Sequence, residues 1–148
     1  MGEIHSQGKV YPTRLGQENV LHSIPIAVVP STSNLTLAAG VLALTVEAIE
    51  KPTIAEFQVV VQTAFNAGTT NVLVVGTTPG GNDIFGSSDI TEGTPGFYPA
   101  NGTVKQVLIT ADTPIYFTYT YTGTNPTTGL AYLLVNVFGL ETIDASAT

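Results

Sequence analysis

The stretch Ala55-Glu-Phe-Gln-Val-Val-Val-Gln-Thr-Ala64 decides the fold class of this chain. Apolar and polar side chains alternate along it: Phe57, Val59 and Val61 fall on one face, and Glu56, Gln58 and Gln62 fall on the other. A period of two residues is the pattern of a β-strand, whose successive side chains point to opposite sides. The stretch therefore predicts a strand with one buried face and one wet face.

Two further segments repeat this period. Val41–Glu50 alternates in the same way, and although it contains good helix formers, Pro52 and the spacing favour a strand over a helix. Ile115–Thr122 consists almost wholly of β-branched and aromatic residues, a density that indicates a strand and excludes a helix.

The segment Leu130–Phe138 is apolar on both faces. Such a strand is expected at the centre of a sheet or under a neighbouring subunit. Shorter strands are predicted over Ser23–Val29, Asn71–Val75 and Val104–Thr110. At least seven strands separated by turns rich in Gly, Pro and Asn predict an all-β chain, a single antiparallel β-sandwich of the jelly-roll type.

Residues 1–22 show no sustained period, so we expect an extended N-terminal arm there, with the sandwich over residues 23–148. Scattered apolar residues on the arm suit a segment that orders on a partner, the alternative being a floppy tail. The candidate contact residues of this arm are Ile4, Val10, Tyr11, Leu15, Val20 and Leu21.

Length and charge limit the classes of function. A chain of 148 residues fits one domain, and its net charge of −7 has the wrong sign for nucleic-acid backbones. No apolar run reaches membrane-spanning length, and the first residues lack the apolar segment of a signal peptide. The absence of cysteine excludes disulfide and thiolate chemistry and suits a reducing cytosol. With only 10% charged residues, the surface suits packing against another protein.

The longest non-periodic stretch runs from Gly76 to Gly102, and long loops of this kind are usually functional or interfacial. It carries large apolar side chains that need a cover, either the chain's own sheet or another subunit. These residues are Ile84, Phe85, Ile90, Phe97 and Tyr98.

The sequence offers little for catalysis or for metal binding. His5 and His22 lack the converging partners of a metal site, and no G-x-S-x-G motif accompanies them. Carboxylates gather on the loop and near Val41–Glu50, but a glycosidase needs two of them fixed across a cleft, and solvated charges are the simpler expectation. Asn82, Asp83 and Asp89 lack the spacing of a dedicated calcium loop. We therefore expect no enzyme, no metal and no cofactor.

Tyrosines offer one further possibility. Tyr98, Tyr116 and Tyr132 could form a sugar-stacking platform, although half-buried tyrosines on a sheet are more often packing residues.

Three segments carry a resemblance to a known family. They are FQVVVQTAFNAGTTNVLVVG (residues 57–76), LITADTPIYF (108–117) and GLAYLLVNVF (129–138). Together they resemble small β-rich structural proteins of tailed bacteriophages, the head decoration or cement proteins. The resemblance implies a jelly-roll or sandwich domain that assembles as a trimer on the capsid surface.

The expected function is therefore structural. The resemblance implies a homotrimer, assembled in the host cytoplasm, that binds the major capsid protein on the outside of a phage head through the arm and the loop residues Ile84, Phe85, Phe97 and Tyr98. A receptor- or glycan-binding domain of a fibre or tail is the first alternative. A small carbohydrate-active enzyme is the second, because fold alone does not separate these functions.

Overall fold

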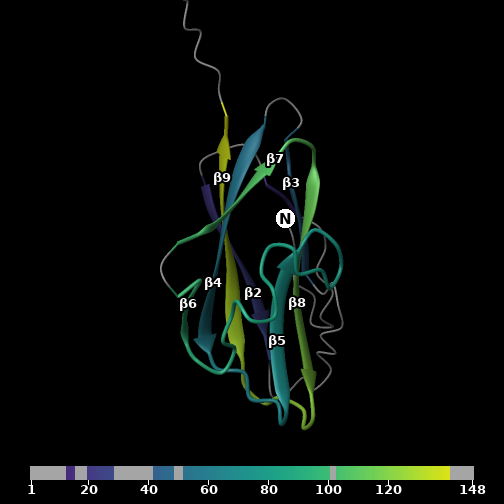
Figure 1. Cartoon of the computed structure of the whole chain (residues 1–148), viewed down its shortest axis with the longest axis vertical. Coiled ribbons are helices and arrows are strands. Elements are labelled where there is room, and N and C mark those ends of the chain that lie inside the picture. The colour runs from purple at the N-terminus through teal and green to yellow at the C-terminus, as the bar shows by residue number, and fades with distance from the viewer. Residues whose placement is uncertain (1–12, 16–19, 29–41, 49–51, 101–102, 141–148) are drawn as a thin grey trace, which may run out of the picture.

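The computed structural model describes residues 13–15, 20–28, 42–48, 52–100 and 103–140 (Figure 1). Within these ranges the chain forms nine strands and no helix. Accordingly, none of the described residues belongs to a helix long and apolar enough to cross a membrane. The strands are β1 (Thr13–Leu15), β2 (Val20–Ala27), β3 (Leu42–Val46), β4 (Thr53–Thr63), β5 (Thr70–Gly76), β6 (Gly96–Tyr98), β7 (Lys105–Ile109), β8 (Thr113–Thr122) and β9 (Leu130–Gly139).

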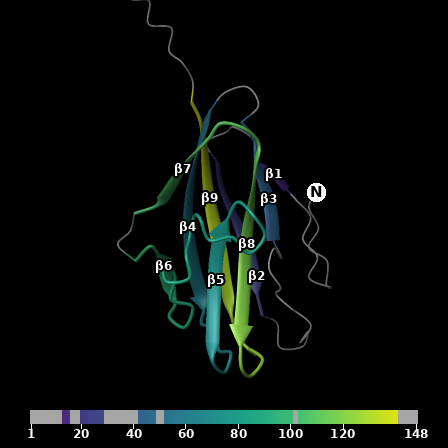
Figure 2. The same ribbon diagram turned by 45° about the vertical axis from the view of Figure 1, so that its right-hand side comes forward.

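The strands form two sheets that face each other (Figure 2). The first sheet has the order β1-β3-β8-β5. The second has the order β2-β9-β4, and the far side of β4 pairs with β6 near one end and with β7 near the other. β1 and β3 are parallel, whereas every other named pair is antiparallel.

The strand partners are nested along the chain, as in a jelly roll. β2 pairs with β9, β3 with β8 and β4 with β7, and beyond them Val75 of β5 forms a β-bridge with Phe85. Nested antiparallel pairs describe one long ribbon, and rolling that ribbon places successive pairs in opposite sheets. The sandwich is therefore jelly-roll-like, and the predicted fold class is confirmed.

The core lies between the sheets and is filled by alternate side chains of the long strands. Buried and half-buried positions alternate along β4 from Thr53 to Val61 and along β9 from Leu130 to Phe138. The largest fully buried side chains include Phe57, Phe85 and Tyr119. Burying a large apolar side chain stabilises the folded state by about 1.5–3 kcal/mol, so this interior supplies most of the driving force.

The longer predicted strands are confirmed, including the one for which a helix was the alternative. Leu42–Val46 pairs with β8, and both Leu44 and Val46 are buried. The strand is shorter than the alternating segment, because it ends at Val46 and the next contact, from Ala48 N to Asp112 Oδ1 at 3.0 Å, is made to a side chain.

The N-terminal boundary differs from the prediction. β1 and the first residues of β2 fall within residues 1–22, yet they are strands of the two sheets. β1 and β6 are only three residues long, too short for a period to reveal them. Residues 1–12 and 16–19 of the predicted arm lie outside the described residues.

Candidate interaction surface

The loop between β5 and β7 is folded onto the chain's own core. Ile84, Phe85 and Tyr98 are buried, which contradicts their predicted role as partner-binding residues and confirms the alternative that they cover their own sheet. The Phe85 N–H donates to Val75 O at 2.9 Å, and Val75 N–H donates to Phe85 O at 3.2 Å. Phe85 therefore occupies the place of a further strand beside β5.

Glu92 closes the same edge of β5 with its side chain. Its Oε1 accepts a hydrogen bond from Leu73 N–H at 2.6 Å, and its backbone oxygen accepts one from Phe65 N–H at 3.0 Å. Burial raises the pKa of Glu92, and this effect outweighs the opposing backbone hydrogen bonds from Leu73 and from its own N–H. The carboxylate thus holds the loop against the edge of β5, and no motif in the sequence indicated this role.

The other two carboxylates of the loop also bind backbone N–H groups. Asp83 accepts hydrogen bonds from both Thr77 N–H and Thr77 Oγ1–H at 2.9 Å. Burial would raise the pKa of Asp83, but the bonds from Thr77 outweigh it, and the pKa lies below its usual value. These bonds hold the turn after β5 in place.

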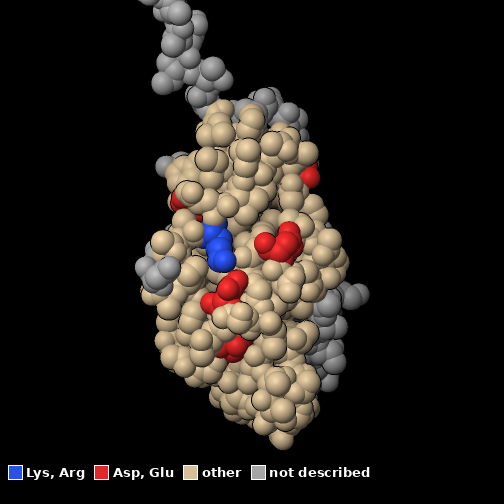
Figure 3. Space-filling view, viewed as in Figure 1, with Lys and Arg blue, Asp and Glu red and all other residues tan. Residues whose placement is uncertain are grey.

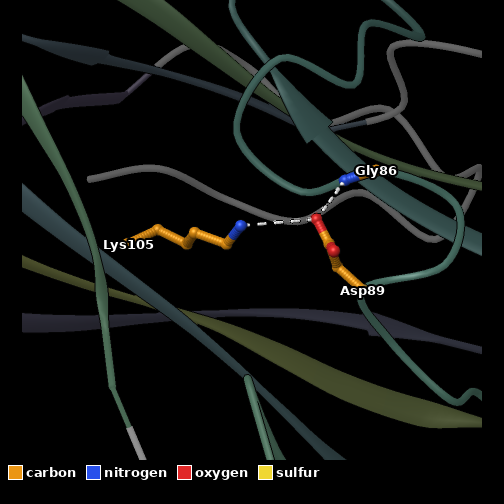
Figure 4. A network of polar contacts seen from close by, with 3 residues as sticks. All are labelled: Gly86, Asp89 and Lys105. Atoms are coloured by element: carbon orange, nitrogen blue, oxygen red, sulfur yellow. Dashed lines mark hydrogen bonds and ion pairs between the residues drawn. The ribbon is translucent and has the colours of Figure 1, made fainter.

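Asp89 links the loop to β7. Its Oδ2 accepts a hydrogen bond from Gly86 N–H at 2.8 Å and lies 3.5 Å from Lys105 Nζ (Figure 4). The same Nζ lies 5.7 Å from the ring centre of Phe85. Both charged groups of the pair are more than a third exposed, so the pair contributes little to stability.

Among the described residues, no three His, Cys, Asp or Glu side chains converge as a metal site would require. Asp83, Asp89 and Glu92 each bind a different backbone N–H, so the loop carboxylates hold turns and an edge. His22 lies in β2, half-buried, whereas His5 is outside the described residues.

The outer face of the second sheet is different, because it exposes large apolar side chains. Phe97 of β6 and Leu108 of β7 are 58% and 60% exposed. On the two central strands, the side chains that alternate with the core residues are half-buried and point away from the interior. They include Ile54 and Val60 on β4 and Tyr132, Leu134 and Phe138 on β9.

The strand register arranges these side chains in rows, which we call the apolar face. Two apolar rows cross the sheet, Pro25-Tyr132-Val60-Phe97 and Phe138-Ile54-Leu108. Between them lie a mixed row of Ser23, Leu134 and Gln58 and a polar row of Asn136, Glu56 and Gln106, in which Gln106 Nε2 donates to Glu56 Oε2 at 2.6 Å. Because directly paired side chains on adjacent strands lie about 5 Å apart, each row is continuous.

Charge is sparse on this molecule. In the space-filling view, one basic patch and a few separate acidic patches stand on a largely uncharged surface (Figure 3). Of the described outward positions on the strands of the second sheet, Glu56 alone carries a formal charge.

The predicted contact residues of the arm are partly placed. Leu15 aligns with Val46 across β1 and β3, and Val20 and Leu21 belong to β2, beside β9. Ile4, Val10 and Tyr11 lie outside the described residues.

The tyrosines proposed as a sugar platform do not lie together. Tyr98 is buried and its hydroxyl donates to Thr94 O at 2.7 Å, so it is a packing residue. Tyr116 is on β8 in the first sheet, and only Tyr132 belongs to the apolar face.

The sequence predicted part of this face, since Phe97 was among the candidate contact residues. The apolar residues on both sides of Leu130–Phe138 indicated Tyr132, Leu134 and Phe138. Ile54, Val60 and Leu108 were missed, because only the register shows that they extend the same rows.

No protein-family model matches this chain, and no curated protein or solved structure matches it either.

Proposed function

We propose that the protein is a structural component of a phage particle, a decoration protein that binds the major capsid protein on the outside of the head as a trimer and stabilises the shell. The observation that carries the proposal is the apolar face, with Phe97 and Leu108 more than half exposed on a rigid sheet. Exposed apolar surfaces of this kind mark sites of contact with other proteins, which for a trimeric decoration protein are its other copies and the capsid.

The chemistry of the loop supports the same conclusion. The long stretch that would supply an active site in an enzyme of this fold is used here to close an edge of β5, with Glu92 and Phe85 as the closing groups. The described carboxylates of the loop are bonded to the backbone, an arrangement that serves rigidity rather than proton transfer.

A decoration protein stabilises a shell by bridging its subunits. Separating two capsid subunits then also breaks the contacts to the bridging protein, and several copies held together bind far more tightly than one. A surface with few charges is suited to this role, because contact desolvates little charge.

The direct test is cosedimentation of the purified full chain with empty heads assembled from the major capsid protein of the same phage genome. We expect saturable binding and heads that withstand a higher temperature when decorated. Deleting residues 2–12, which leaves β1 in place, tests the contribution of the arm. Failure of the full chain to bind the heads would contradict the proposal.

A glycan-binding domain is the second candidate, favoured by Phe97 and Tyr132 lying in one row beside the amide of Gln58. Aromatic faces flanked by amide groups can stack on and hydrogen-bond to sugars. Binding to a glycan array that is lost on Phe97→Ala, with no binding to heads, would favour this candidate.

A further inference from the structure

We propose that the apolar face is where neighbouring copies of this chain contact one another. The inference rests on the proposed function in one respect, since a decoration protein is expected to act as an assembly of copies. The inference goes beyond the proposed function by identifying the surface through which the copies bind one another.

The size of the face is sufficient for such a contact. β2 and β9 are in register over eight residues, and four strand positions lie side by side if β6 and β7 are counted as one. At about 3.4 Å per residue and about 4.8 Å between strands, the face covers about 27 by 19 Å, or about 500 Å² per copy. Two copies would therefore bury about 1,000 Å² together, about the minimum expected of a specific interface, and the faces of three copies meeting around one axis would bury about 1,500 Å².

The charge distribution favours a second copy as the occupant. Each chain carries a net charge of −7, so contact between two copies is least opposed where a surface carries few acidic groups. The apolar face is such a surface, because Glu56 is the one carboxylate among its described residues, and it accepts a hydrogen bond from Gln106. Copies that meet here bury apolar rows and amides and bring in one carboxylate per copy, whereas a strongly basic partner would find a single acidic group to bind.

Two of the outer edges, those of β2 and β5, are protected against the other route, in which copies join by adding strands. Val28 N–H donates to Gly129 O, and therefore the N–H groups of alternate residues of β2 point toward β9. Pro25 falls in the opposite set, so the N–H that it lacks would have faced the outer edge. The outer edge of β5 is occupied by Phe85 and by the Glu92 carboxylate. Such devices protect these two edges from strand addition, which favours contact through the face.

The test compares three variants that each add one negative charge. Leu108→Glu and Phe97→Glu place it in the two apolar rows, and Thr120→Glu places it at an exposed position of β8 on the first sheet. The mass of the full chain in solution is measured by light scattering against concentration, and circular dichroism confirms that each variant is folded. We expect the native chain and Thr120→Glu to assemble alike, and each of the other two to assemble at least about tenfold more weakly. A native chain that stays single, or an assembly that survives both face variants, would overturn the inference.

Cosedimentation of the same variants with heads separates this inference from the proposed function. Variants that keep their assembly but lose the heads would show that the face docks on the capsid, and the inference would be wrong. A native chain that assembles through the face yet does not bind heads would contradict the proposed function and leave the inference standing.

Discussion

The loop after β5 and the apolar face both carry large apolar side chains, but the chain uses them in opposite ways. Phe85 and Phe97 show the contrast most directly, since Phe85 of the loop is fully buried and Phe97 of the face is 58% exposed. The loop turns its apolar groups inward because carboxylates and the Phe85 bridge hold its backbone against β5. The strands of the face have already filled the core with their other side, so their outward groups stay in contact with water.

This difference shows that an apolar residue outside the regular strand pattern is a poor guide to an interface. What decides is whether the backbone can turn the side chain inward. The following substitutions test whether the loop residues stabilise the core and whether the residues of the face do not.

Phe85→Ala should have the largest effect. The ring is fully buried, and truncating a buried phenylalanine typically costs about 3–5 kcal/mol of unfolding free energy. Denaturant unfolding of the variant measures this cost, with Phe97→Ala as the matched exposed substitution. If the two variants lost equal stability, the proposed division between loop and face would be wrong.

Glu92→Ala should have the next largest effect. It removes the acceptor of the Leu73 N–H and leaves that buried donor without its partner, at a cost of about 1–3 kcal/mol. Hydrogen exchange of the Leu73 amide provides a local measurement, because exchange there should accelerate more than in β9. Unchanged exchange at Leu73 would show that the loop stays closed without the carboxylate.

Glu92→Gln should have a smaller effect that depends on pH. The pKa of Glu92 is raised in the folded state, so the folded chain holds the proton more tightly than the unfolded chain. The contribution of this group to stability is therefore lost as the pH rises from the pKa of the unfolded chain through the higher pKa of the folded one. A neutral amide keeps an acceptor for Leu73 and avoids the buried charge. At pH 7 the variant should therefore be slightly more stable than the native chain, by less than about 1 kcal/mol of unfolding free energy, which thermal unfolding measures. The two should unfold alike at pH 4, and an equal difference at both pH values would contradict this assignment.

Leu108→Ser should have the smallest effect on the isolated chain. Because the side chain is 60% exposed, the loss should stay within about 0.5 kcal/mol when unfolding is measured at a concentration too low for assembly. At higher concentrations the native chain should gain stability by association and the variant should not. A loss that is independent of concentration would show that Leu108 supports the fold of its own chain.

The sequence predicted the sandwich well because period-two alternation is a local property. Glu56 and Gln58 lie outward between Ala55, Phe57 and Val59, as the pattern of the strand requires. The candidate site was harder to predict. Ile84 and Phe85 looked available in the loop, and the carboxylate that holds it against β5, Glu92, carried no recognisable motif.

The sequence by itself determined which residues form strands and which side of each strand enters the core, because both follow from the alternation of side chains along an extended backbone. Only the tertiary structure decided that β4, β6, β7 and β9 set their outward side chains in common rows and that the loop turns inward. Both depend on contacts between residues far apart in the chain, such as Ile54 with Leu108 and Phe138, and no local period records the register of such contacts.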